Sequence, residues 1–367
     1  MFDAIDNALR EPGAATFESF RVPRTYLEHL RGGGQIAELE QRIAMFYGSK
    51  YAVCTSSATV ALLAICLALD LKGTDFITSP LNFGAGLAGW LLRGNRPVFV
   101  DVDPGTLTID PAMIASSVTS KTKAMLSVDL FGYPADDAAI RKAADDLGIW
   151  YIADSAQAFG ATRNGRPASI LADATIISFN SQKTIRAGEG GCIVTNNDDI
   201  YERLIWTSQH PLRQKLELGI DVYNEFAFSS RLHPAAAAAA LATFDESLER
   251  LTNYQELCFE VISLLEETGQ VLPAHLSNKD IRPTFFGLVL MPSAGHGRTK
   301  MAQFLLDFGY ECGGSREVGP PVYQNGVFLQ QYRDQFLVPS PCHTAEGTNS
   351  RISLSCLERL TTIGRKS

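Results

Sequence analysis

The stretch IWYIADSAQAFGA, residues 149–161, joins an apolar run to a polar turn. Its first part, Ile149–Asp154, is continuous in apolar residues rather than alternating, and it ends on a carboxylate. A strand with this pattern is buried on both faces, as in a parallel sheet covered by helices on either side. In such sheets, ligands bind at the carboxyl ends of the strands, so Asp154 marks a candidate site.

Apolar runs of the same kind recur on both sides of this stretch. They are Phe76–Thr78, Pro97–Val102, Lys123–Phe131, Ala174–Phe179 and Gly191–Thr195. The spacing of apolar residues predicts helices over about 36–46, 59–71 and 136–147. The second helix is apolar nearly all round, which is typical of a helix inside a sizeable protein. We therefore predict an α/β fold with a large, mostly parallel sheet and helices on both faces.

The pattern changes at His233. An alanine-rich helical stretch follows, from Pro234 to about Glu267. Beyond it we expect a strand at 285–291, a helix at 299–308, a loop over 313–349 and a strand at 351–355. This arrangement predicts two domains: a large cofactor-binding domain, 1–240, which includes an N-terminal segment, and a small C-terminal α/β domain, 241–367.

Composition excludes several classes of function. The chain has 367 residues and a formal net charge of −8, with no block of basic residues, so nucleic acid and membrane surfaces are poor partners. We find no secretory signal and no apolar run long enough to span a bilayer. The seven cysteines show no CxxC spacing, which predicts reduced thiols and no metal site. We expect a cytoplasmic enzyme.

Three kinds of reactive group occur in order along the chain. A polar run, Thr55–Thr59, begins the apolar helix; Asp154 ends one strand; and Ser178 ends the next, five residues before Lys183. Alone, these residues would be helix caps and a solvated lysine. Together they supply an anion cradle, a carboxylate and an amine. Pyridoxal phosphate needs all three, for its phosphate, its ring nitrogen and its aldehyde.

The region from about Gln35 to Ala242 resembles a known family. These are the pyridoxal-phosphate-dependent sugar and aminocyclitol aminotransferases of the DegT/DnrJ/StrS group, which have fold type I. The resemblance rests on the ordered blocks GGGQIAELEQRIAMFYGSKYAVCTSSATVAL (32–62), PVFVDVDPGTLTIDP (97–111), VDLFGYPADDAAI (128–140), YIADSAQAFGA (151–161) and ISFNSQKTIRAGEGGCIVTNN (177–197).

The resemblance implies a role for each matching residue. Lys183 would hold the cofactor as a Schiff base and then move protons, and Asp154 would pair with the pyridinium nitrogen. Gln157 would contact the ring or its phenolic oxygen, and Phe83 would stack on the ring, although a plain core position is the alternative. The phosphate would be held by Ser57, Thr59 and Ser178.

Several positions depart from the family pattern. Ala58 stands where the family usually has Gly in the phosphate loop, and Asp129 stands where many members carry His near the substrate. Ser229 replaces an Asn that reaches the neighbouring subunit's cofactor, whereas Arg231 of the same segment is retained. The resemblance therefore predicts a homodimer with shared sites, in which the contact made by Ser229 is weakened or lost.

Two further residues lie close to Lys183 in the sequence. The family does not fix an arginine at Arg186, which either caps a loop carbonyl or grips an anionic group of a substrate. Glu189, in the GEGG turn, is expected to be structural.

The leading hypothesis for function is amino transfer. Glutamate or glutamine would supply the amine, and the acceptor would be a carbonyl of a sugar, cyclitol or related polar intermediate of amino-sugar or antibiotic biosynthesis. Two alternatives stay open: a dehydratase or other lyase on the same fold, and a non-catalytic regulatory relative. The dehydratases of this family replace the lysine by histidine, so Lys183 favours amino transfer.

Overall fold

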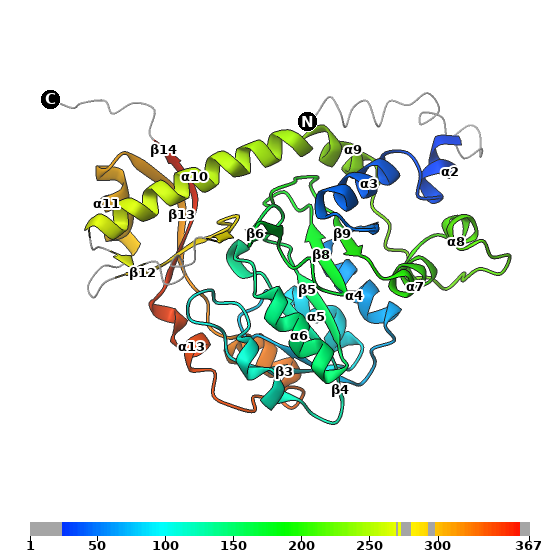
Figure 1. Ribbon diagram of the computed structural model, residues 1–367, viewed down its shortest axis with the longest axis horizontal. Coiled ribbons are helices and arrows are strands. Elements are labelled where there is room, and N and C mark those ends of the chain that lie inside the picture. The colour runs from blue at the N-terminus through cyan, green and yellow to red at the C-terminus, as the bar shows by residue number, and fades with distance from the viewer. Residues whose placement is uncertain (1–23, 269–270, 273–279, 293–297, 360–367) are drawn as a thin grey trace.

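The computed structural model describes residues 24–268, 271–272, 280–292 and 298–359. Within these residues, seven strands form the main sheet in the order β1-β9-β8-β5-β4-β2-β3 (Figure 1). Their bounds are Tyr51–Thr55 (β1), Asp75–Thr78 (β2), Arg96–Phe99 (β3), Thr122–Val128 (β4), Trp150–Asp154 (β5), Ala174–Ser178 (β8) and Gly191–Thr195 (β9).

Five neighbouring strands of this sheet, β8, β5, β4, β2 and β3, run parallel. β9 pairs antiparallel with both β8 and β1, so β1 has the direction of the parallel strands. The predicted mostly parallel sheet is confirmed, and each of its predicted strands is present. The sequence analysis did not identify β1. Since all strands but β9 point the same way, their carboxyl ends meet at one edge of the sheet.

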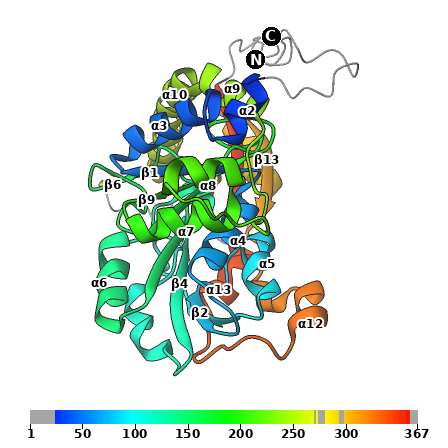
Figure 2. The same cartoon turned by 90° about the vertical axis from the view of Figure 1, so that its right-hand side faces the viewer.

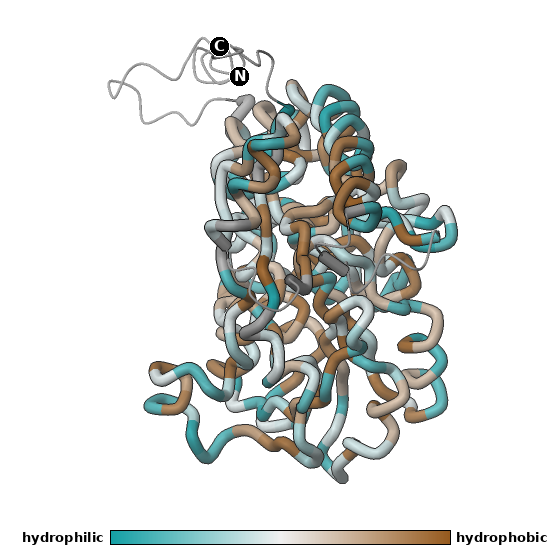
Figure 3. Tube along the Cα trace, turned by 90° about the vertical axis from the view of Figure 1, so that its left-hand side faces the viewer, coloured by the Kyte–Doolittle hydropathy of each residue, from teal (hydrophilic) through white to brown (hydrophobic). Residues whose placement is uncertain are grey.

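Helices cover both faces of the sheet, as predicted (Figure 2). One face packs on α4, α5 and α7, and the opposite face packs on α3, α6 and α9. The bounds are Gln35–Tyr47 (α3), Ala58–Ala68 (α4), Gly84–Leu92 (α5), Asp137–Leu147 (α6), Asp198–Ser208 (α7) and Pro234–Ala242 (α9). Hydrophobic and hydrophilic segments both occur along the chain in the view of Figure 3. The helices α5 and α7 were not predicted, nor were α2 (Arg24–Leu30) and α8 (Pro211–Leu218).

The alanine-rich stretch is two helices instead of the single predicted one. The first, α9, ends at Ala242, and α10 spans Phe244–Thr268. At the junction, the Thr243 hydroxyl donates to the carbonyl of Ala239, 3.1 Å away. A threonine that bonds back to the preceding turn bends or interrupts a helix. The long helix α10 then leads from the main sheet to the C-terminal strands (Figure 1).

A second, smaller sheet contains described strands in the order β10-β12-β14-β13. Their bounds are Val271–Leu272, Leu288–Pro292, Ile352–Arg359 and Tyr310–Glu317, and α11 spans Arg298–Asp307. Short strands β6 (Thr162–Arg163), β7 (Arg166–Pro167) and β11 (Ile281–Arg282) form a further sheet. The division into a domain of residues 1–240 and a domain of residues 241–367 stays a prediction. Residues 1–23 of the first and 360–367 of the second lie outside the described residues.

The predicted loop over 313–349 is wrong in part. It contains the end of β13 and the helices α12 (Gly326–Tyr332) and α13 (His343–Glu346). Contacts with the edge of the main sheet order this segment: the Phe99 N–H donates to the carbonyl of Leu337 at 2.8 Å, and the Asp101 carboxylate accepts the N–H groups of Thr344 and Ala345. These partners are distant in sequence, so no local periodicity revealed the helices.

No helix among the described residues is long and apolar enough to cross a bilayer. They also contain no group of three or more His, Cys, Asp or Glu side chains that could hold a metal ion.

Candidate active site

The carboxyl edge of the main sheet gathers the residues that the sequence singled out. Asp154 ends β5, and Ser178 ends the neighbouring β8. Ser178 pairs with Gly191, the first residue of β9. The loop after β8 carries Lys183, and β1 leads at the same edge into α4.

Asp154 is a buried carboxylate at the centre of this edge. Its Oδ1 accepts the N–H of Ala156 at 3.0 Å. Burial raises the pKa of Asp154, and the Ala156 N–H and the positive amine of Lys183 oppose that rise. The positive charge of the Lys183 amine therefore acts on the Asp154 carboxylate.

Lys183 lies at one end of a cleft of about 940 Å³. Its Nζ is 4.1 Å from the centre of the Phe286 ring. The cleft runs between the Lys183 loop, α10 and the second sheet, and Arg186, Arg250 and Tyr254 also line it. The lysine amine thus faces a space large enough for a polar small molecule.

The first turn of α4 forms a cradle next to Ser178. Ser57 caps the helix, and its Oγ accepts the N–H of Val60 at 3.1 Å. Gly191 packs on this turn so closely that a Cβ there would lie 2.5 Å from the Ala58 nitrogen. Ala58 is the first helical residue, and its φ is not among the positive values, so alanine fits where the family has glycine. A helix N-terminus with hydroxyls from Ser57 and Thr59 suits a phosphate.

Phe83 and Gln157 flank the site in different ways. Phe83 immediately precedes α5 and is 68% exposed, so an aromatic face is available to a ligand. The Gln157 side-chain oxygen accepts the N–H of Phe131 at 2.7 Å. Phe131 has a φ of 55°, a conformation that costs energy for a residue with a side chain. Gln157 thereby holds the turn beside the site.

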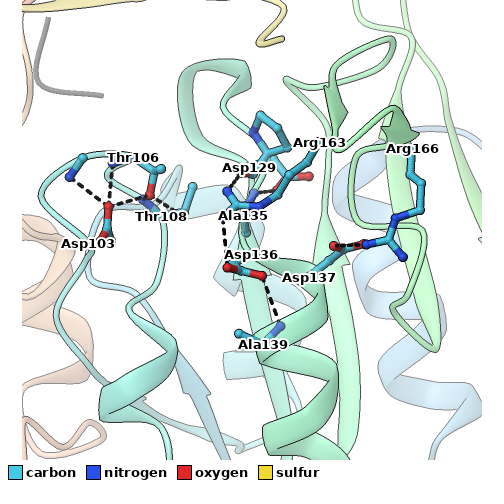
Figure 4. A network of polar contacts seen from close by, with 12 residues as sticks. Asp103, Thr106, Thr108, Asp129, Ala135, Asp136, Asp137, Ala139, Arg163 and Arg166 are labelled. Carbon is cyan, nitrogen blue, oxygen red and sulfur yellow. Dashed lines mark hydrogen bonds and ion pairs between the residues drawn. The ribbon is translucent and has the colours of Figure 1, made fainter. Parts of the chain in front are cut away.

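Asp129 is fully buried beneath Asp154. Its Oδ1 accepts the N–H of Ala135 at 2.8 Å (Figure 4). Its Oδ2 accepts the hydroxyls of Ser155 and Ser169. Its own N–H donates to the carbonyl of Asp154 at 3.0 Å. The structure thus places Asp129 in the interior, as a support for the turn after β5, and not on the surface of the cleft.

Asp129 should make protein stability depend on pH. Burial raises its pKa to about 6, from 3.8. Because the folded carboxyl binds its proton more tightly than the unfolded one, the free energy of unfolding should fall as pH rises from about 4 to about 6 and stay level above. In the parent, the free energy of unfolding should fall by about 3 kcal/mol over this pH range, and Asp129→Asn should abolish that fall. Urea unfolding of both proteins between pH 4 and 7 checks it; identical pH slopes would contradict it.

Arg186 and Glu189 belong to the Lys183 loop. The Arg186 Nε donates to the carbonyl of Lys183 at 3.2 Å, and the exposed side chain also lines the cleft. Arg186 therefore caps a loop carbonyl and also lines the cleft, so the two interpretations of this residue are compatible. Glu189 accepts the amide N–H of Asn180 at 3.0 Å, a contact within the loop.

Ser229 and Arg231 are not brought to the Lys183 cleft. They line a separate hollow with His210, Lys215 and Tyr223. Burial and the neighbouring charge of Arg231 lower the pKa of His210. The segment itself lies against the loop before α4, because the Ser56 N–H donates to the carbonyl of Ser230 at 2.7 Å.

Two residues near the site were missed. Phe286, over the lysine amine, lies in a stretch that reads as an ordinary apolar strand. The side-chain Nδ2 and Oδ1 of Asn82 are buried, and within the described part of the chain neither has a hydrogen-bond partner. In the sequence, the feature that could have indicated Asn82 is its position directly before Phe83, the residue expected to stack on the ring.

Pyridoxal phosphate fits these residues. The buried Asp154 carboxylate and the Lys183 amine interact electrostatically. The N-terminus of α4, which carries hydroxyl groups, lies beside Ser178, and the absence of a side chain at Gly191 lets β9 pack closely on that turn. The unpaired buried amide of Asn82 points to a group that belongs in the site.

The chain is similar to several known proteins. A family model described as the DegT/DnrJ/EryC1/StrS aminotransferase family matches residues 24–362. The UDP-2-acetamido-2-deoxy-3-oxo-D-glucuronate aminotransferase of Pseudomonas aeruginosa is 31% identical over 65% of each chain. The GDP-perosamine synthase of Escherichia coli O157:H7 is 28% identical over 82% of this chain and 80% of its own. The structure of DesI in the presence of its TDP-sugar product matches at 27% identity and a TM-score of 0.70, over 92% of this chain and 86% of that one.

Proposed function

Because the chain belongs to the DegT/DnrJ/EryC1/StrS aminotransferase family, we propose that it transfers an amino group with pyridoxal phosphate as cofactor. The donor is an amino acid, glutamate or glutamine. The acceptor is a carbonyl of a sugar, cyclitol or related secondary-metabolite intermediate. The observation that carries the proposal is that the charge of the Lys183 amine, which lines the cleft, acts on the buried carboxylate of Asp154.

Each residue of the site has a part in this chemistry. When bound, the cofactor supplies an electron sink for the negative charge left on carbon after a proton is removed. Asp154 keeps the ring nitrogen protonated, which strengthens that sink. Ser57, Thr59 and Ser178 hold the phosphate. Lys183 would hold the cofactor covalently, and its neutral amine, once released, would take the α-proton of the donor and deliver it to the cofactor's aldehyde carbon.

A screen of donors and acceptors tests the function. The purified holoenzyme is mixed with glutamate or glutamine, and 2-oxo acid formation is measured with nucleotide-linked keto sugars and with free keto cyclitols. We expect one acceptor class to sustain many turnovers. A protein that forms no 2-oxo acid from any donor, even in a single turnover, would contradict amino transfer.

Arg186→Lys is expected to raise the Michaelis constant of one substrate by about 10- to 100-fold, because lysine keeps the charge but loses the planar donor fork. The absorbance of the bound cofactor should stay unchanged. Steady-state kinetics with donor and acceptor varied separately identify the half-reaction. Arg203→Lys, on the exposed face of α7, is the control. Unchanged constants for both substrates would leave Arg186 only its contact with the Lys183 carbonyl.

The active protein is proposed to be a homodimer in the cytoplasm. Ser229 and Arg231 lie outside the cleft of their own chain, in a segment whose apolar residues are strongly exposed; Phe226 is 96% and Val222 77% exposed. A second copy would cover them and bring Arg231 to the neighbouring cofactor. Free thiols suit the cytoplasm, and they are found at Cys54, Cys66, Cys192, Cys258, Cys312 and Cys342.

Arg231→Ala is expected to weaken cofactor binding by about 10-fold or more, the range for a charged hydrogen bond, with little loss of fold stability. Cofactor titration and thermal unfolding of the same samples separate the two effects. Sedimentation at dilute concentration tests the assembly, and a fully active monomer would contradict it.

A further inference from the structure

Asn82 lies in the loop between β2 and α5, directly before the exposed Phe83. Its amide nitrogen and oxygen are both buried and, among the described residues, have no hydrogen-bond partner. Leaving a buried donor or acceptor unpaired costs about 1–3 kcal/mol each. An amide that pays this cost next to a binding site is expected to gain its partner when the site is filled.

Gly86 shows what the amide faces. A Cβ on Gly86 would lie 2.9 Å from Asn82 Oδ1 and 3.2 Å from Asp154 Oδ2, so the amide and the carboxylate converge on one point. Gly86 is in the first turn of α5 and its φ is not positive, so the backbone does not require glycine there. Glycine is unfavourable in a helix, by about 1 kcal/mol relative to alanine. Its presence keeps the space between the two side chains clear.

We propose that Asn82 is a positioning residue of the cofactor site, whose amide donates a hydrogen bond to Asp154 Oδ2 and holds that carboxylate against the ring nitrogen of bound pyridoxal phosphate. Oδ1 of Asp154 is already held by the N–H of Ala156. A half-turn of the amide, a torsion with two broad minima, exchanges Oδ1 for Nδ2 at the point that faces Asp154.

The chemistry of the ring excludes a direct contact as the main role. The atoms next to the ring nitrogen of pyridoxal phosphate carry only a methyl group and a hydrogen, neither of which can pair with an amide. The group within reach that can accept from Asn82 is therefore the carboxylate. A neutral donor suits this place, because it favours the ionised form of a carboxyl whose pKa burial raises.

The inference rests on the proposed function only because it requires pyridoxal phosphate as the cofactor. It does not depend on which carbonyl compound accepts the amino group. Its test therefore compares the full chain with and without this cofactor and needs no turnover. Asn82→Leu removes the amide at similar volume. Gly86→Ala places a methyl group between amide and carboxylate. Ser79→Ala is the control, since the Ser79 hydroxyl has a partner within the same loop, the carbonyl of Leu81 at 3.0 Å.

We expect Asn82→Leu to leave the thermal midpoint of the cofactor-free chain equal to or above that of the parent, because it removes an unpaired buried amide. The Gly86→Ala methyl group crowds Asn82 Oδ1 at 2.9 Å, so the midpoint of this variant is compared only between its own cofactor-free and loaded forms. Both variants should weaken pyridoxal phosphate binding by about 10-fold or more, the range for a hydrogen bond to a charged group. The pH at which the absorbance of the bound cofactor titrates should also shift. Ser79→Ala should lower both thermal midpoints equally and leave the titration unchanged.

Two outcomes would overturn the proposal. If Asn82→Leu lowers the thermal midpoint of the cofactor-free chain as much as that of the loaded chain, the amide is structural. If cofactor affinity and titration are unchanged in both variants, Asn82 does not act on Asp154. An enzyme that binds the cofactor as expected but accepts no amino donor would refute the proposed function and leave this inference standing.

Discussion

Lys183→Ala is expected to abolish covalent cofactor binding and to lower amino transfer by about 10⁴-fold, the upper range for loss of a positioned acid–base group. The other cations that line the cleft, within the described residues, are Arg186, Arg250 and Arg359. Arginine stays protonated under all ordinary conditions, so none of them can replace a neutral amine.

Borohydride reduction followed by peptide mass analysis checks this directly. In the parent protein the cofactor mass should appear on the peptide that contains Lys183, and in the variant on no peptide. Lys72→Ala, at the exposed turn after α4, is the control and should behave like the parent. A labelled peptide elsewhere, or normal turnover without Lys183, would contradict the assignment.

Asp154→Asn is expected to slow amino transfer by about 10- to 100-fold, the loss that corresponds to one hydrogen bond to a charged group. A neutral amide cannot keep the ring nitrogen protonated, whereas the phosphate contacts of Ser57 and Ser178 are unaffected. The stability of the cofactor-free chain at pH 7 should not fall. Because the folded pKa of Asp154 is raised, its ionised form costs stability above that pKa, and asparagine removes the cost.

Single-turnover kinetics of this variant test the expected loss of rate, and urea unfolding of the same variant tests the expected stability. Asp75→Asn is the matched control: Asp75 is also buried, but it begins β2 at the opposite edge of the sheet, where it pairs with Arg96 at 2.7 Å. That variant should lose stability and keep its turnover rate. If Asp154→Asn reacts at the parent rate, Asp154 is outside the site.

The sequence by itself was sufficient for the main sheet and for the order of the reactive residues. Strands buried on both faces are continuous in apolar residues, and this pattern is local, so Ile149–Asp154 and its parallel neighbours could be read directly. Parallel strands end at one edge, which is why Asp154 and Ser178 could be expected to lie together before any coordinates were known. The assigned roles of Lys183 and Asp154 remain predictions that the variants above test.

Only the tertiary structure decided the features that depend on partners distant in the sequence. The helices α12 and α13 are held by the edge strand β3 and by Asp101, and no periodicity in their own residues announces them. Asp129 is a support beneath the site because three elements bring hydrogen-bond donors to it. Asn82 Oδ1 and Asp154 Oδ2 come from separate loops and strands, yet both lie close to where a Cβ of Gly86 would stand. Local sequence patterns show which face of a helix or strand is buried. Which residues then contact each other depends on how helices and strands from distant parts of the chain pack together, and this is decided by the whole chain.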